Sequence, residues 1–194
     1  MPLKSRRSIV KKLKERIGFL NDSAGSEKKD EILVYLDELR VPDFLAEVLQ
    51  IESASFDSPW EKQKFIEQLR NPNCKGVVAK YQDCIVGFMI YELYKTRIHL
   101  LSFAVDPIYR RMGIGTQMVA SLVSDLTPSR LNKIILEVRE TNLPAQLFFR
   151  SCEFRYITTL RNHFPEIGED AYLMQYKVEH PSKNRHTRPT CLHG

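Results

Sequence analysis

The chain has 194 residues, of which 43% are hydrophobic and 27% are charged, a size and composition typical of one globular domain with a sizeable core. No apolar run reaches the ~18 residues that a transmembrane helix needs, and no secretory leader is expected, because no clean apolar segment follows the basic N-terminus. The net charge of +5 is concentrated in residues 1–30 and 179–194, while residues 31–178 carry slightly more acidic than basic side chains. This distribution does not support a basic nucleic-acid groove across the folded body.

The four cysteines form no Cys-x-x-Cys pair, so we expect reduced thiols in a cytoplasmic protein. They are Cys74, Cys84, Cys152 and Cys191. The histidines near the C-terminus, His186 and His193, do not have the spacing of metal ligands with Cys191, and no metal site is expected.

The first 30 residues are predicted to form a basic arm and a linker. Ile9, Leu13, Ile17 and Leu20 recur at helical spacing among Lys and Arg, which indicates either a short amphipathic helix or a solvated arm. Residues 21–30 have linker composition. Such an arm is suited to contact RNA, an acidic protein surface or anionic lipid.

The next segment alternates strand and helix signals. A strand is expected at 31–40, followed by a helix over 43–54 that Asp43 caps. Residues 56–60 read as a loop, and Trp60 begins a second helix that ends at Leu69. Two strands, 75–81 and 84–94, are joined at Gln82-Asp83 as a hairpin. The first helix is expected to turn its apolar side chains inward, namely Phe44, Leu45, Val48 and Leu49.

The remaining elements continue the mixed α/β pattern. A strand at 97–105 precedes a helix at 113–126, and a buried strand at 132–138 precedes a helix at 143–152. Strands at 153–160 and 171–178 complete a domain that spans residues 31–178, and residues 179–194 are expected to form a disordered basic tail.

One motif points to chemistry. After the strand 97–105, the chain reads Arg110-Arg111-Met-Gly113-Ile-Gly115 and enters a helix. The glycines allow the backbone to approach an anion, and the helix N-terminus supplies free N–H groups for a pyrophosphate. The two arginines add positive charge. Met118 stands where the dinucleotide fingerprint needs a third glycine, and no Gly-Lys-Ser/Thr loop is present. A turn that simply feeds an amphipathic helix is the alternative.

The order of elements and several short motifs together resemble the GNAT acetyltransferase superfamily, and specifically its bacterial ribosomal-protein-alanine N-acetyltransferases. The resemblance covers roughly residues 40–178. The matching motifs are Phe56-x-x-Pro59-Trp60, Ala104-Val105-Asp106-Pro107, Tyr109-Arg110-Arg111-x-Gly113-x-Gly115, Leu136-Glu137-Val138-Arg139 with Asn142, Arg161-Asn162 with Pro165, and Gly168-Glu169-Asp170-Ala171.

The resemblance implies an α/β (α+β) GNAT fold, with a mixed, mostly antiparallel central sheet flanked by helices. It also implies acetyl-CoA as cofactor, bound along a bulged fourth strand and at the glycine turn. The implied cofactor-binding residues are Phe103, Ala104, Val105, Arg110, Arg111, Met112, Gly113, Ile114, Gly115, Thr116, Asn142 and Phe149.

The implied activity is transfer of acetyl to the N-terminal α-amino group of a protein, such as a ribosomal protein, by direct attack. Glu137 is the candidate general base, because it ends an apolar strand and matches the family's base position. An ion pair with Arg139 is its alternative role. His99, inside a strand, is interpreted as structural or as another base. Cys152 has no His in local sequence that would activate it as a nucleophile.

The family's general acid is a tyrosine twelve residues after the base, and here that position is Phe149. Three explanations are open. The thiolate leaves without full protonation, since thiols have pKa values near ~8.5. Alternatively, water or another donor such as Tyr156 or Tyr172 replaces the tyrosine. In the third, the domain binds acyl-CoA without catalysis.

The expected acceptor site is formed by Phe56, Trp60, His163 and Phe164. His163 and Phe164 replace tyrosines common in the family's loop, and Trp60 is equally suited to anchor the core. Acetylation of a small amine or a lysine is the enzymatic alternative.

Overall fold

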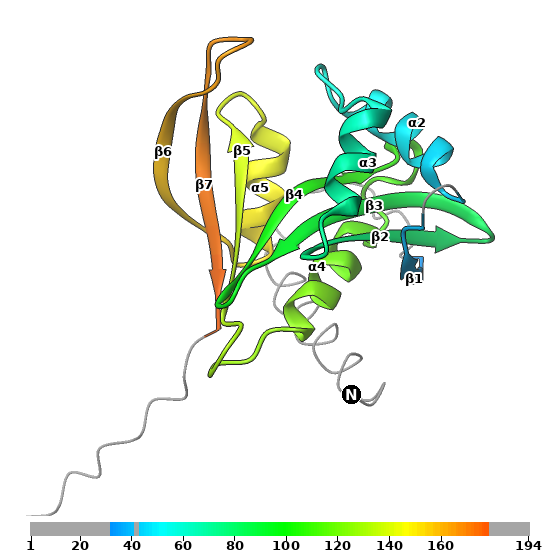
Figure 1. Ribbon diagram of the computed structural model, residues 1–194, viewed down its shortest axis with the longest axis horizontal. Helices are drawn as coiled ribbons and strands as arrows, with labels where there is room; N and C mark the ends of the chain where they lie inside the picture. The colour runs from blue at the N-terminus through cyan, green and yellow to red at the C-terminus, as the bar shows by residue number, and fades with distance from the viewer. Residues whose placement is uncertain (1–31, 41–42, 179–194) are drawn as a thin grey trace, which may run out of the picture.

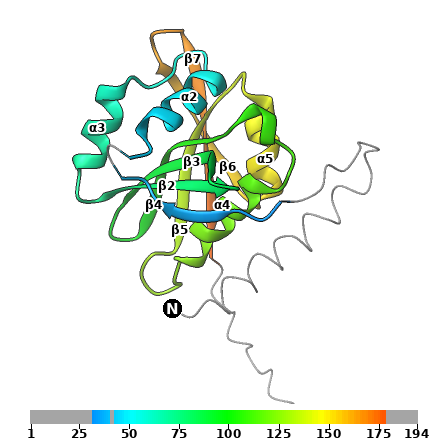
Figure 2. The ribbon, with the colours of Figure 1, turned by 90° about the vertical axis from the view of Figure 1, so that its right-hand side faces the viewer.

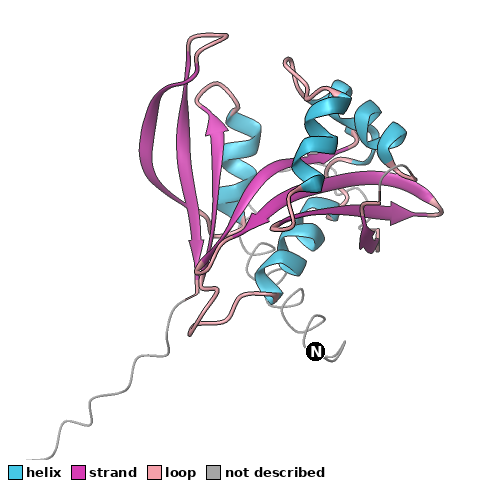
Figure 3. Cartoon of the chain, in the orientation of Figure 1, coloured by secondary structure: helices cyan, strands magenta, loops and turns pink. Residues whose placement is uncertain are grey.

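The computed structural model describes residues 32–40 and 43–178 (Figure 1). The predicted arm, linker and tail lie outside the described residues. The described chain forms one seven-stranded sheet, in the order β1-β2-β3-β4-β5-β7-β6, together with four α-helices (Figure 3). None of these helices is long and apolar enough to cross a membrane.

The elements follow the predicted order along the chain. They are β1 (Tyr35–Glu38), α2 (Leu45–Ser55), α3 (Lys62–Arg70), β2 (Cys74–Tyr81), β3 (Cys84–Leu93), β4 (Arg97–Val105), a short 3-10 turn (Pro107–Tyr109), α4 (Ile114–Ser124), β5 (Lys133–Arg139), α5 (Leu143–Ser151), β6 (Arg155–Phe164) and β7 (Glu169–Lys177). Neighbouring strands are antiparallel except β4 and β5, which are parallel. The predicted mixed, mostly antiparallel sheet is therefore confirmed.

Three local predictions need correction. Asp43 does not cap α2, which begins after Phe44 without a side-chain cap. The helix predicted from Trp60 begins at Lys62, after Glu61 in an extended conformation, and the Trp60 N–H is bound by the Glu52 carboxylate. The strand predicted at 31–40 is reduced to four residues, because Gln117 of α4 binds the backbone that precedes it. The Gln117 amide donates to the Ile32 carbonyl at 2.7 Å and accepts from the Val34 N–H at 3.2 Å.

The hairpins follow from their turns. Gln82 and Asp83 both have positive φ, 48° and 64°, as a tight two-residue connection between β2 and β3 requires. The β6–β7 hairpin extends further than predicted, and its last register pair joins Phe164 to Glu169.

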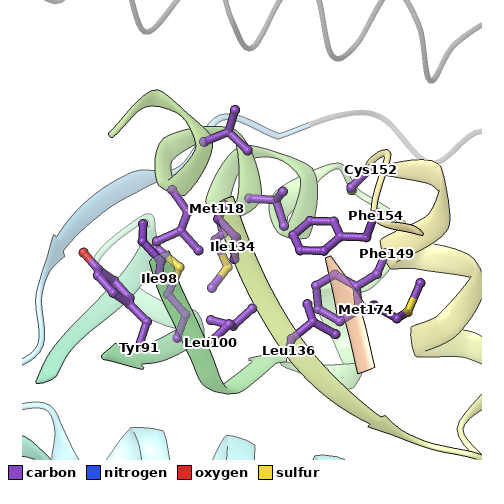
Figure 4. Packing of buried hydrophobic residues seen from close by; sticks show 14 of the residues in the cluster. Tyr91, Ile98, Leu100, Met118, Ile134, Leu136, Phe149, Cys152, Phe154 and Met174 are labelled. Atoms are coloured by element: carbon purple, nitrogen blue, oxygen red, sulfur yellow. The ribbon is translucent and has the colours of Figure 1, made fainter. Parts of the chain in front are cut away.

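The sheet buries one hydrophobic cluster on each face. The larger cluster joins α4 and α5 to alternate residues of β4 and β5, including Ile98, Leu100, Ile134 and Leu136 (Figure 4). The smaller joins α2 and α3 to Phe88, Ile90 and Ala104. Because side chains alternate along a strand, His99 and Glu137 lie on the α2–α3 face of the sheet, opposite the larger cluster.

Candidate active site

The parallel strands β4 and β5 separate halfway along their length. Their register pairs run from Arg97 with Lys133 to Leu100 with Leu136 and then stop, although β4 continues to Val105. The β3–β4 register shifts at the same level, which leaves Leu101 as an extra residue on β4. Within the described chain, residues 102–105 therefore have strand partners on β3, and residues 101–105 have none on the β5 side (Figure 1).

The glycine motif forms the predicted turn into α4. Gly113 has a φ of 77°, a left-handed conformation that glycine adopts without penalty, and it is the N-cap of the helix. No side chain caps this end, so the N–H groups of the first turn have no side-chain acceptor. Met112 accepts a hydrogen bond from the Ile32 N–H, at 3.2 Å. Ile114 is buried in the larger cluster and Thr116 is partly exposed.

Gly115 allows α4 and α5 to approach each other closely, and it does not adopt an unusual backbone conformation. A Cβ added there would lie 2.9 Å from the Phe148 ring of α5. Phe148 stacks on Phe103 of β4, with ring centroids 5.7 Å apart. The glycine thus lets α4 and α5 meet above the separated part of β4.

The two arginines occupy different places. Arg110 donates from Nε to the Val105 carbonyl at 3.0 Å and from its guanidinium to the Ser55 hydroxyl at 2.9 Å. It therefore connects the end of β4 to the end of α2. Arg111 is exposed in the turn, with a positive φ of 68°.

Glu137 is the first β5 residue beyond the β4–β5 register pairs. Its Oε2 lies 2.7 Å from Nε2 of His99 on β4. The side chains are 18% and 21% exposed, so this contact is largely sheltered from solvent. The alternative pairing with Arg139 is not found, because Nε of Arg139 lies 3.8 Å from Glu169 and its guanidinium lies over the Phe164 ring.

The general-acid position is apolar in three dimensions as well. Phe149 is 6% exposed and packs edge-on against Phe103, Phe148 and Phe154, beside Met174 (Figure 4). Asn142 caps α5, since its side chain accepts a hydrogen bond from the Ala145 N–H.

The two alternative proton donors lie together. Tyr156 and Tyr172 pack edge-on, with ring centroids 5.6 Å apart, in a groove between α5 and the β6–β7 hairpin. The Tyr156 hydroxyl lies 3.0 Å from the Thr159 hydroxyl. Tyr172 is the register partner of Val138, whose side chain belongs to the larger cluster on the α5 face. Tyr172 therefore lies on the opposite face of the sheet from Glu137.

The expected acceptor residues belong to two segments, the loop between α2 and α3 and the end of β6, which lie at the same end of the sheet (Figures 1 and 2). Phe56 and Trp60 follow α2, and Trp60 packs edge-on against Phe65 at 5.4 Å, as a core anchor does. His163 and Phe164 lie at the end of β6, with ring centroids 4.9 Å apart. The β5–α5 loop, which follows Glu137, lies at the same end.

A buried carboxylate that the sequence analysis did not single out holds the first of these groups. Glu52 of α2 is only 2% exposed. It accepts hydrogen bonds from the Trp60 N–H at 2.8 Å and from the Ser102 hydroxyl of β4 at 3.3 Å. Burial raises the pKa of Glu52, against the lowering effect of these bonds. The sequence does contain a signal for Glu52: it is an acidic residue on the face of the predicted helix that turns its apolar side chains inward.

Cys152 is unsuited to form a covalent intermediate. It is fully buried after α5, and burial raises its pKa to about 12. The nucleophilic thiolate is therefore strongly disfavoured near neutral pH.

The separated strands and the glycine turn fit an acetyl-CoA molecule. The unpaired backbone of residues 101–105 matches the amides of a pantetheine arm, and the uncapped α4 N-terminus matches a pyrophosphate. A bulged strand beside a parallel neighbour that separates from it, ahead of a helix with a glycine turn, is the arrangement of an acyl-CoA-dependent transferase of the GNAT type.

Comparison with known proteins agrees with this class. The sequence matches the Acetyltransferase (GNAT) family over residues 45–154, more than half of the chain. The chain therefore belongs to the GNAT acetyltransferase family, whose acetyl donor is acetyl-CoA.

Relatives and solved structures agree with the assignment. The chain is 31% identical over 120 residues to the ribosomal protein bS18-alanine N-acetyltransferase of Haemophilus ducreyi, which covers 61% of this chain and 81% of that protein. It is 27% identical over 141 residues to an N-alpha-acetyltransferase of Sulfurisphaera tokodaii, covering 66% and 84%. The crystal structure of the Escherichia coli ribosomal-protein-S18-alanine N-acetyltransferase superimposes with a TM-score of 0.68 at 25% identity, covering 78% and 98%.

Proposed function

We propose that this N-acetyltransferase acetylates the N-terminal α-amino group of a protein, with Glu137 as general base. The observation that carries the proposal is the place of Glu137, directly beyond the last β4–β5 pair and on the face that α2 covers. Both relatives named above are N-terminal or ribosomal-protein acetyltransferases. A ribosomal protein N-terminus is therefore the first acceptor to test.

The proposed reaction does not require a strong general base. A free α-ammonium has a pKa of about 7.7–8.0, so a nearby carboxylate has only to accept its proton. Acetyl-CoA supplies an acetyl thioester, whose carbonyl carbon bonds to the amine nitrogen as the C–S bond breaks. Glu137 accepts the proton that the amine loses. Backbone N–H groups of residues 101–105 are available to stabilise negative charge on the carbonyl oxygen.

We propose that the thiolate leaves without a proton from Phe149. A thiol with a pKa near ~8.5 is a good leaving group, and water protonates it afterwards. The alternative donors Tyr156 and Tyr172 lie on the same face of the sheet as Phe149, but they pack against each other and the Tyr156 hydroxyl lies 3.0 Å from the Thr159 hydroxyl.

The proposal also covers the cellular compartment of the protein and the role of the basic arm, residues 1–30. We propose a cytoplasmic location, because the sequence has no Cys-x-x-Cys pair and its cysteines are expected to be reduced thiols. Residues 1–30, with nine Lys and Arg and four Asp and Glu, are proposed to contact RNA or an acidic surface. Binding to RNA should weaken steeply with salt, and removal of residues 1–30 should abolish this dependence. Binding that is insensitive to salt, or that survives the truncation, would argue against it.

The test is a matched set of acceptors. Peptides with different first residues are assayed for CoA release beside the same peptides with a blocked N-terminus and an internal lysine, free lysine and a polyamine. The proposal expects release only with free N-termini. Equal release with blocked peptides would indicate a lysine acetyltransferase. Tight acetyl-CoA binding without turnover on any acceptor would favour a binding module.

A further inference from the structure

The contact between His99 and Glu137 joins β4 to β5. Nε2 of His99 lies 2.7 Å from Oε2 of Glu137, within the range of a short, charge-assisted hydrogen bond. The parallel register explains why they meet. His99 is the register partner of Ile135, and Glu137 lies two residues further along β5 on the same face. The pair bridges β4 and β5 at the point where the strands separate.

We propose that His99 is a positioning residue that holds the Glu137 carboxylate in the orientation needed to accept the amine proton. This inference rests on the proposed function of Glu137. With the Nε2–H tautomer, the imidazole donates to Oε2 and leaves Oε1 for the acceptor. Among the described residues, no hydrogen bond to Oε1 of Glu137 is present.

The surroundings make the orientation of this imidazole specific. The Tyr94 ring lies 6.5 Å from the His99 ring, centroid to centroid, and its hydroxyl donates to Glu92 at 2.8 Å. Glu92 is also the register partner of His99 on β3. Arg97, on the same face of β4, lies over the Tyr94 ring. His99 is therefore enclosed on the β3 side, with its Nε2 directed across the strand opening.

The other side chain able to restrain Glu137 is engaged elsewhere. Arg139 is next along the same face of β5, but it pairs with Glu169 and covers the Phe164 ring. Within the described part of the chain, His99 is the ionisable partner recorded for Glu137. A carboxylate held by one partner keeps its position only while that partner donates, so loss of the donor should reduce turnover more than binding.

Two amide substitutions separate positioning from other roles. In His99→Gln, the amide nitrogen takes the approximate place of Nε2 and can still donate to Oε2. In His99→Asn, the amide is one methylene shorter and does not reach Glu137. Both remove the titratable ring, so the pair differs mainly in reach.

The experiment measures kcat, peptide KM and acetyl-CoA affinity for both variants, alone and combined with Glu137→Gln. We expect kcat to fall ~10–100-fold in His99→Asn and within ~3-fold in His99→Gln, at nearly unchanged KM and acetyl-CoA affinity. In the Glu137→Gln background, His99→Asn should have no further effect, because coupled residues are not additive. Thermal unfolding of each variant identifies any loss of folded protein.

The outcomes are distinguishable. Equal large losses in both variants would show that His99 itself exchanges the proton, and would overturn a positioning role. Full activity in His99→Asn beside an inactive Glu137→Gln would also overturn it, while the proposed function stands. Full activity in Glu137→Gln would instead contradict the proposed function.

Discussion

Two carboxylates face the same side of the sheet from different layers, and their surroundings differ. Glu52, in the helix layer, is buried, and each of its oxygens accepts a hydrogen bond, one from Trp60 and one from Ser102. Glu137, on the sheet, is bound through one oxygen to His99 at the edge of the strand opening. A carboxylate whose two oxygens are both hydrogen-bonded is suited to hold structure, whereas one with an oxygen that has no hydrogen bond can accept a proton there. The contrast supports the proposal that Glu137, rather than Glu52, takes part in the reaction.

The largest expected effect is the loss of turnover when Glu137 is replaced. Glu137→Gln keeps the shape of the side chain and removes its basicity. Turnover of a free-N-terminus peptide should fall by ~10²–10⁴-fold, the usual contribution of a general base. Acetyl-CoA affinity and the unfolding midpoint should change little, because Glu137 does not contact the glycine turn and is not in either hydrophobic cluster. Steady-state kinetics and chemical denaturation measure both. Turnover within ~10-fold of the unmodified protein would end the assignment.

For replacement of Glu52 we expect a loss of stability rather than a loss of turnover. Glu52→Leu leaves the partly buried Trp60 N–H without its acceptor and should reduce the free energy of unfolding by ~1–3 kcal/mol. The matched variant Glu52→Gln keeps an oxygen for this N–H and should remain closer to the original stability. Urea unfolding gives the difference, and a large loss of turnover in well-folded Glu52→Gln would place Glu52 in the reaction instead.

A smaller effect is the pH dependence of the stability difference between Glu52→Gln and the original protein. Since burial raises the pKa of Glu52 in the folded protein, the native state holds this proton more tightly than the unfolded chain. Stability from this group is therefore present below the unfolded pKa and declines as pH rises to the folded pKa. Unfolding midpoints across this window should show Glu52→Gln gaining on the original protein as pH increases. A constant difference, or one of opposite sign, would contradict the raised pKa.

The smallest effect concerns the missing hydroxyl. Phe149→Tyr restores the family's side chain at a position packed among Phe103, Phe148 and Phe154. If the thiolate leaves unaided, turnover should change by no more than a few-fold, since the leaving group already has a low pKa of about 8.5. Comparison with Phe149→Leu corrects for packing. An increase of ~100-fold in Phe149→Tyr alone would show that proton donation limits the reaction.

Local patterns predicted the fold well where they were strong. The strand 97–105 has the same bounds in the structure, and β5 and α5 agree within one residue at each end, because their apolar periodicity and flanking turns are unambiguous. The Asp43 cap was wrong, since α2 begins after Phe44 with no side-chain cap. The long first strand was also wrong, because Gln117, distant in sequence, makes contacts with the backbone of Ile32 and Val34. Such contacts have no local signature.

The sequence predicted individual parts of the candidate site but not how they are arranged. The glycine turn was predicted from its motif, and Glu137 was proposed from the resemblance. The contact of His99 with Glu137 depends on the parallel register of two strands separated by α4, and one sequence does not specify that register. The burial of Glu52 likewise depends on how α2 packs on β4, which places Ser102 opposite its carboxylate.

The most direct test is a crystal structure of the full chain with a conjugate of CoA and an acetylated N-terminal peptide. The peptide nitrogen should lie about 3 Å from Oε1 of Glu137, or one water away. The pantetheine should lie against residues 101–105, with His99 still bound to Oε2. A peptide nitrogen beside Tyr156 and Tyr172, on the α5 face, would contradict the assignment of Glu137 as the base.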